Sequence, residues 1–182
     1  MTPRLTLLDR DGVINADSPS YIKHVDEWHP IPGSIEAIAR LSRNGHRVHI
    51  VTNQSGLARG LFTAATLEKI HHRLLHLVTR AGGHLDGIFY CPHAPHDRCD
   101  CRKPRPGLLL AAAQASQSDL AAAAMIGDSF SDILAARTVG ARPILVKTGN
   151  GFETLFHHPE LIQEIAVFEN LMQAAEHLLA SE

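Results

Sequence analysis

The sequence lacks a long hydrophobic run and an excess of charge of either sign. Its 17 Lys and Arg residues nearly balance 19 Asp and Glu residues, which leaves a formal net charge of −2 with the histidines neutral. This balance argues against a broad nucleic-acid-binding or membrane-binding surface, although it allows a local basic pocket. No apolar run approaches the roughly 18–20 residues that a membrane span needs, and no signal-peptide pattern opens the chain. We therefore expect a cytoplasmic protein that binds neither nucleic acid nor membrane.

Cysteine is also scarce, and its three copies are clustered between Cys91 and Cys101. The odd count argues against a simple disulfide framework. Chance rarely places every cysteine of a 182-residue chain in one short window. The clustering therefore favours a local site over scattered structural thiols.

The rest of the composition is that of an ordinary globular protein. Apolar residues make up 45% of the chain and charged residues 20%, both usual values. A length of 182 residues suits one domain, and no repeat or low-complexity linker interrupts it. We expect a single domain over residues 1–182, with a monomer as the default because nothing marks a dimer face.

Short aliphatic runs alternate with helical patterns along the chain. Strands are predicted at residues 5–8, 48–51, 88–90, 125–126 and 144–146. Helices are predicted from an N-cap at Ser34 to Gly45, over 67–81, over 108–115 with Pro106 in the first turn, over 132–139, and after an N-cap at Asn170. This alternation predicts a doubly wound α/β fold with a mostly parallel sheet. Because such sheets bind ligands at the carboxyl ends of their strands, the residues after each run are the candidate site.

Two aspartates follow the first run, in the order Asp9-Arg10-Asp11-Gly12. They can share a hard cation such as Mg²⁺, and an aspartate can attack a phosphoryl group as a covalent nucleophile. Asp11 could protonate the leaving alkoxide and later activate water. A calcium loop is disfavoured because its twelfth position is Ser20 rather than glutamate, whereas a plain acidic turn remains open.

Complementary groups follow the later runs. Thr52 and Asn53 offer polar groups for phosphate oxygens, Lys103 offers a compact cation, and Asp128 offers a third acidic ligand. Each has an ordinary alternative, namely a turn, a solvated loop or, for Asp132, a helix cap that stabilises the helix N-terminus. Together, however, they make a full set for phosphoryl transfer by positioning and charge.

These residues carry a family resemblance that covers the chain from Asp9 to Asp132. In order, they resemble the four motifs of the haloacid-dehalogenase-like phosphatases: Asp9-x-Asp11-Gly12, Thr52-Asn53, Lys103 and Gly127-Asp128-x-x-x-Asp132. The resemblance implies Asp9 as nucleophile and Asp11 as acid and base. It implies Thr52 and Lys103 as groups that stabilise the phosphoryl group. It also implies Mg²⁺ on Asp9, on the main-chain oxygen of Asp11 and on Asp128.

The cysteine cluster predicts a second metal site. Cys91-Pro92-His93 and Cys99-Asp100-Cys101 supply three thiolates and an imidazole within eleven residues, enough to close a tetrahedral Zn²⁺ site. The gaps are tighter than in common zinc fingers, and His96 is a rival ligand. We predict Zn²⁺ on Cys91, His93, Cys99 and Cys101 rather than inert thiols.

The string from Cys91 to Lys103 narrows the resemblance to a zinc-containing subgroup with heptose bisphosphate and histidinol-phosphate phosphatases. In that subgroup the zinc is structural and a large cap domain is missing, and the short segments between the motifs agree. Histidinol-phosphate enzymes tend to carry aspartate where this chain has Ser55, so the heptose enzymes are the better match. The resemblance implies removal of the 7-phosphate of a heptose 1,7-bisphosphate, a small sugar phosphate, through an aspartyl-phosphate.

It also implies substrate contacts in three places. They are Asp17, Ser20 and Tyr21 in the first loop; Asn53, Gln54, Ser55 and Arg59 in the second; and Arg102 and Lys103 in the third, with Arg105 a further candidate for the second phosphate. A histidinol-phosphate phosphatase remains the main alternative. A zinc-stabilised binding module without catalysis is another, although it would have no use for Asp11. A phosphopolynucleotide 3′-phosphatase should show a basic groove, and none is visible.

Overall fold

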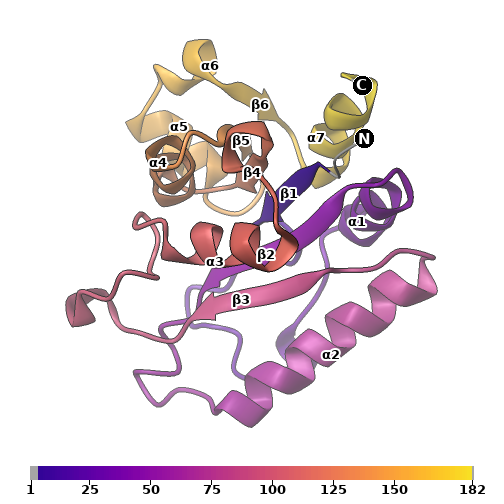
Figure 1. The fold of residues 1–182 in the computed structure, drawn as a ribbon. Coiled ribbons are helices and arrows are strands. Elements are labelled where there is room, and N and C mark those ends of the chain that lie inside the picture. Colours follow the sequence, from indigo (N-terminus) through magenta and orange to yellow (C-terminus); the bar gives the residue numbers. More distant parts are fainter. Residues whose placement is uncertain (1–3, 182) are drawn as a thin grey trace.

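The computed structural model describes residues 4–181, which fold around one six-stranded sheet (Figure 1). All strand pairs are parallel, and the strands lie in the order β3-β2-β1-β4-β5-β6. The strands are β1 (Leu5–Leu8), β2 (Arg47–Asn53), β3 (Gly87–Cys91), β4 (Ala124–Gly127), β5 (Arg142–Val146) and β6 (Ala166–Phe168). The α-helices are α1 (Ser34–Arg43), α2 (Ala64–Arg80), α3 (Gly107–Ser116), α4 (Phe130–Thr138), α5 (Gly151–His157), α6 (Leu161–Glu164) and α7 (Leu171–Ala180). Three short 3₁₀ turns are η1 (Val25–Glu27), η2 (Pro95–Asp97) and η3 (Leu120–Ala122).

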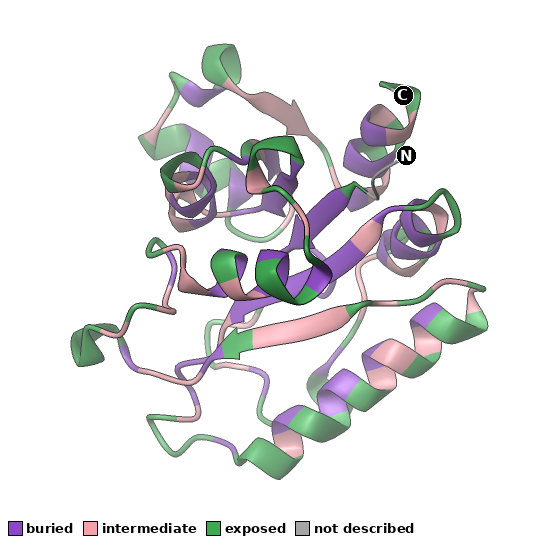
Figure 2. Ribbon diagram, in the orientation of Figure 1, coloured by how far each residue is buried: buried purple, intermediate pink, exposed green. Residues whose placement is uncertain are grey.

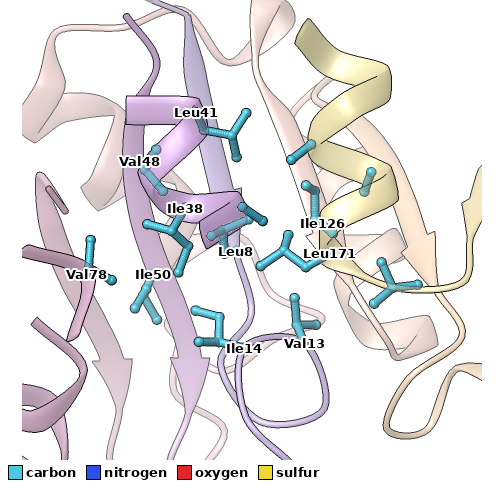
Figure 3. Close-up of a cluster of buried hydrophobic side chains, with 14 of the residues drawn as sticks. Leu8, Val13, Ile14, Ile38, Leu41, Val48, Ile50, Val78, Ile126 and Leu171 are labelled. Carbon is cyan, nitrogen blue, oxygen red and sulfur yellow. The ribbon is translucent and has the colours of Figure 1, made fainter. Parts of the chain in front are cut away.

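Helices cover both faces of the sheet, which explains the nearly continuous apolar strands. On one face, Leu8 and Ile50 pack with side chains of α1, α2 and α7, including Ile38 and Leu171 (Figure 3). On the other face, Leu7 packs with residues of α3 and α4. Successive strand residues thus enter opposite layers, and the central strands are buried (Figure 2).

The structure confirms the doubly wound α/β fold and the five predicted strands, and it adds β6, α5 and α6. Two predicted helix starts are wrong in detail. Gly33 occupies the N-cap of α1, while Ser34 is its first residue and donates its hydroxyl to the Ile14 carbonyl. Pro106 is the N-cap of α3 rather than a residue of its first turn. Asn170 caps α7 as predicted, because its side chain accepts a hydrogen bond from the Gln173 N–H.

The segments between the motifs hold no large insertion. Residues 9–33 form a loop with η1, in which Trp28 is fully buried, and residues 54–63 form a second loop before α2. These loops stand above the carboxyl ends of β1 and β2. Across residues 4–181, none of the helices has both the length and the apolar character needed to cross a membrane.

Candidate active site

The predicted acidic and basic residues meet at the carboxyl ends of β1, β2 and β4. The central strand β1 has β2 on one side and β4 on the other, so its connections leave in opposite directions and open a crevice at its end. A cavity of about 340 Å³ lies there. Its lining includes Asp9, Asp11, Thr52, Lys103 and Asp128.

Lys103 is buried beneath this cavity and holds the carboxylate of Asp9. Its side chain is 1% exposed, and Nζ lies 3.0 Å from Asp9 Oδ1 and 2.6 Å from Asp132 Oδ1. Nζ also donates to the Val51 carbonyl at 2.7 Å. Burial alone would lower the pKa of Lys103, but Asp132 and Asp9 raise it above its ordinary value. The lysine is therefore a fixed positive charge beside Asp9.

Three carboxylates form an acidic cluster around this charge. Asp9, Asp128 and Asp132 each offer an oxygen, and these oxygens lie within 4.8 Å of one another. Burial and the neighbouring carboxylates raise the pKa of Asp9 to about 7 and that of Asp128 to about 8, against the pull of Lys103. One lysine does not balance three carboxylates, of which two are buried. The donor set fits a hard divalent cation such as Mg²⁺, which would supply the missing charge.

The side chain of Asp11 lies outside this cluster and is held by its own set of donors. Arg10 contacts both carboxylate oxygens, Asn15 Nδ2 donates to Oδ1 at 2.9 Å, and Gln54 Nε2 donates to Oδ2 at 2.8 Å. Burial would raise the pKa of Asp11, but Arg10 and these hydrogen bonds hold it below its ordinary value. Asp11 is thus held by side-chain donors that do not contact Asp9.

Backbone and amide groups surround Asp128 Oδ2. Asn150 donates to this oxygen from its backbone N–H at 2.7 Å and from Nδ2 at 3.1 Å. Gly12 (φ +83°) and Gly149 (φ +58°) approach so closely that a Cβ on either would collide with it. Only glycine combines this approach with a positive φ, so the two loops enclose one oxygen of Asp128 and fix the carboxylate.

Asp132 caps α4, as the sequence allowed, and also pairs with Lys103. Oδ1 pairs with Lys103, while Oδ2 accepts from the N–H and hydroxyl of Ser129 in a capping box at the start of α4. The cap thereby fixes the carboxylate that orients the lysine.

The residues after β2 mainly hold other site residues. Asn53 Nδ2 donates to the Lys103 carbonyl and Asn53 Oδ1 accepts from the Lys103 N–H, both at 3.1 Å. Gln54 Nε2 donates to Thr52 Oγ1 at 3.0 Å as well as to Asp11. Both amides line the cavity, yet their hydrogen bonds join β2 to Lys103 and to Asp11.

Most, but not all, of the predicted sugar contacts line the cavity. Asp17, Tyr21, Ser55 and Arg102 do so, in addition to Asn53 and Gln54. Ser20 and Arg59 are not part of the lining. The Ser20 hydroxyl lies 3.2 Å from that of Ser18, and Arg59 Cζ lies 5.9 Å from the centre of the Tyr21 ring. Arg105 is also outside and donates to the Cys99 carbonyl at 2.7 Å.

Sequence reasoning placed Ser18 and Pro19 in the first substrate loop, and both line the cavity; it missed Ile22, Ser129, Ser131 and Asn150. Asn150 could have been predicted as a site residue, because it closely follows β5 and ligands bind at the carboxyl ends of strands in such sheets. Ser129 and Ser131 closely follow β4 and had the same signal, but a serine in a loop is too common to be singled out.

The cysteine cluster forms a compact site in the loop between β3 and α3. The Sγ atoms of Cys91, Cys99 and Cys101 and one ring nitrogen of His93 lie within 4.8 Å of one another. Cys101 Sγ lies 3.3 Å from His93 Nδ1 and 3.1 Å from Cys91 Sγ. The His96 side chain is 85% exposed and points to Asp97 instead. Three thiols and one imidazole converging in this way fit a tetrahedral metal such as Zn²⁺.

Comparison with known proteins identifies the family. A model described as HAD-hydrolase-like matches residues 100–174. A D-glycero-beta-D-manno-heptose-1,7-bisphosphate 7-phosphatase from Pseudomonas putida is 50% identical over 97% of this chain and 99% of its own, and one from Pseudomonas aeruginosa is 51% identical over 98% and 99%. A similar solved structure is the crystal structure of D,D-heptose 1,7-bisphosphate phosphatase from B. bronchiseptica, complexed with magnesium and phosphate. Its sequence is 47% identical, and the match covers 98% of this chain and 99% of that chain with a TM-score of 0.94. With this likeness over nearly its whole length, the chain belongs to the heptose bisphosphate phosphatase family of the HAD-like hydrolases, which are phosphomonoester hydrolases.

Proposed function

We propose that the protein removes the 7-phosphate of D-glycero-β-D-manno-heptose 1,7-bisphosphate. The observation that carries the proposal is the Asp9 carboxylate, held by Lys103 at 3.0 Å in the wall of an open cavity, in a chain about half identical to named 7-phosphatases. A 7-phosphate is a primary ester at the end of the sugar, so it can reach Asp9 without passing a cap. The rest of the sugar then extends toward the loops.

Asp9 is the proposed nucleophile. An Asp9 oxygen forms a bond to phosphorus as the ester P–O bond breaks, and the leaving sugar oxygen takes a proton from Asp11. Water then attacks the aspartyl-phosphate, gives a proton to Asp11, and releases inorganic phosphate and Asp9. Lys103 and Thr52 are proposed to neutralise and orient the phosphoryl oxygens.

Two metals are part of the proposal. Mg²⁺ is assigned to Asp9, Asp128 and the main-chain oxygen of Asp11, where it supplies positive charge to the phosphoryl group. Zn²⁺ is assigned to Cys91, His93, Cys99 and Cys101 as a structural ion. Support comes from the acidic and thiol clusters and from the magnesium-bound relative.

Arg102 is the proposed contact for the second phosphate. It lines the cavity next to Lys103, and its Nη1 donates to the His93 carbonyl at 3.4 Å, which ties it to the thiol cluster. A phosphate bound by Arg102 would supply binding energy that positions the ester for attack at Asp9.

The deciding experiment measures kcat/KM for phosphate release from a panel of esters. The panel holds the β and α anomers of the heptose bisphosphate, histidinol phosphate and p-nitrophenyl phosphate. We expect the β bisphosphate to exceed histidinol phosphate by at least about tenfold, or about 1.4 kcal/mol in transition-state binding. Arg102→Ala should reduce kcat/KM for the bisphosphate far more than for p-nitrophenyl phosphate. Asp9→Asn should be inactive on every ester and serves as the blank.

Faster hydrolysis of histidinol phosphate would overturn the substrate assignment and leave the phosphatase class intact. The compartment and assembly state are proposals as well. Three free thiols gathered in a metal-type cluster suit the reducing cytoplasm, and a monomer remains a prediction that light scattering would test.

A further inference from the structure

The residue between the two motif aspartates is a buried arginine that grips one of them. The Arg10 side chain is 1% exposed. Its Nε donates to Asp11 Oδ1 at 3.0 Å, and its Nη2 donates to Oδ1 and Oδ2 at 2.9 and 3.0 Å. A guanidinium that bonds both oxygens of a carboxylate fixes its orientation as well as its charge.

The remaining nitrogen of Arg10 reaches across to helix α2. Nη1 lies 3.3 Å from Nε2 of His71, a residue that is 8% exposed. Arginine has no acceptor, so His71 Nε2 is the unprotonated acceptor of this bond. His71, which lies 61 residues further along the chain, therefore holds the arginine through Nη1, the nitrogen that does not contact Asp11.

Asn15 and Gln54 also donate hydrogen bonds to the Asp11 carboxylate. With their bonds, the Asp11 carboxylate receives five donor contacts. Yet 24% of the Asp11 side chain remains exposed, and it lines the cavity beside Asp9. The protein thus fixes this carboxylate in one orientation while leaving it open to substrate.

We propose that Arg10, supported by His71, is a positioning residue that aims Asp11 at the ester oxygen. The proposal rests on the proposed phosphatase mechanism and adds two residues to it. Arg10 touches neither substrate nor phosphorus; it acts through the direction in which Asp11 presents its oxygens. In the first step the proton moves from Asp11 to the leaving oxygen as the P–O bond breaks. In the second, a proton moves from water to Asp11 as water bonds to phosphorus and the bond to Asp9 breaks.

Esters with different leaving groups distinguish a positioning role of Arg10 from general damage to the structure. An alkoxide needs a proton to leave, whereas p-nitrophenolate leaves without one. In Arg10→Lys, charge is kept but the two-pronged contact is lost. For a simple primary alkyl phosphate, we expect kcat to fall by about 100-fold or more while KM changes by less than about threefold.

With p-nitrophenyl phosphate, Arg10→Lys should release a first equivalent of p-nitrophenol at nearly the wild-type rate and then turn over slowly. The burst arises because formation of the aspartyl-phosphate no longer needs Asp11, while its hydrolysis still does. Equal loss of the first step on both esters, or no loss on either, would overturn the proposal.

Variants of His71 keep the test valid if Arg10→Lys does not fold. His71→Leu removes the acceptor for Arg10 and should show the same burst with a smaller loss, about 10-fold on the alkyl ester. His71→Gln restores an acceptor oxygen and should recover most of that loss. His72→Leu, on the exposed side of the same helix, is the control and should match wild type. Equal behaviour of His71→Leu and His71→Gln would refute the role of His71. Simple esters make this test independent of the heptose assignment.

Discussion

Asn150 joins two loops that lie far apart in the sequence. Its Nδ2 donates to Asp128 Oδ2 at 3.1 Å and to Asp17 Oδ2 at 3.2 Å. A single side chain thereby connects a proposed Mg²⁺ ligand to the loop proposed to contact the sugar. Occupancy of the metal site and the position of the sugar loop should depend on each other through this residue.

Asn150→Ala should therefore weaken Mg²⁺ binding and raise KM for the bisphosphate. The backbone N–H of residue 150 still reaches Asp128 in the variant, so the loss should be partial, about 10-fold in the Mg²⁺ concentration for half-maximal activity. Titration of activity with Mg²⁺ and isothermal calorimetry would measure it. Asn44→Ala, at the exposed end of α1, is a matched control. An unchanged Mg²⁺ requirement would show that Asp128 is held without this side chain.

At the residue scale, the sequence predicted which charged groups lie together in the cavity better than it predicted their hydrogen-bond partners. Asp9 and Asp128 could be named because each directly follows a strand, and Lys103 because it is a cation in the loop after the cysteine cluster. The partners of Asn53 and Gln54 could not be predicted. A side-chain amide can form hydrogen bonds with substrate or with protein groups equally well, and which of the two it contacts depends on distances in the folded structure.

The loop between β3 and α3 is the element that depends most on a metal. It contains η2, a single 3₁₀ turn, and all four members of the thiol cluster lie in or beside it. Without an ion, three thiols packed together contribute little to stability, and their shared position has to be held by the loop alone.

Cys99→Ser should remove zinc and lower the melting temperature by about 5 °C or more. It should also raise KM for the bisphosphate, because Arg102 is tied to this loop through the His93 carbonyl. Its effect on kcat should be smaller, since Asn53 holds the Lys103 backbone from β2. Elemental analysis and thermal unfolding are the measurements. His96→Ala should retain zinc, and a wild-type protein without zinc when purified reduced would contradict the assignment.

Elements with strong apolar patterns could be predicted, and those without them could not. The strand β6 has three residues, all only half-buried at the sheet edge, so its pattern is too short to recognise. Helix α5 begins at Gly151 and exposes two large apolar residues, Phe152 and Phe156. Its sequence therefore lacks the one-sided apolar pattern by which a helix is recognised. Both are stabilised by packing against β5 and its neighbours rather than by local sequence preference.

For the whole molecule, the acidic cluster predicts a stability that depends on pH and on metal. In the folded protein without metal, the pKa of Asp9 is about 7 and that of Asp128 about 8, whereas in the unfolded chain both are near the ordinary value of 3.8. The folded state thus binds protons more tightly. The contribution of these groups to stability is fully present below about pH 4 and is lost as pH rises toward 8.

Mg²⁺ should replace those protons and restore the lost stability. We expect Mg²⁺ to raise the melting temperature of EDTA-treated protein more at about pH 8 than at about pH 5.5, where protons compete for the carboxylates. Thermal unfolding at both pH values, with and without Mg²⁺, measures this difference. Asp119→Asn, at the exposed turn before η3, should leave it unchanged. An equal Mg²⁺ effect at both pH values would count against the cluster as the binding site.

The sheet order has a consequence for synthesis on the ribosome. The central strand β1 is made first, but one of its two neighbours, β4, spans Ala124–Gly127 and is made after two thirds of the chain. Until then, a nascent chain with β1, β2 and β3 paired leaves one edge of an apolar strand open, where other chains can add. Asp9 directly follows that same strand, and Asp128 directly follows β4. Translation that stalls before residue 124 therefore yields an aggregation-prone half-sheet that carries Asp9, the proposed nucleophile, without Asp128.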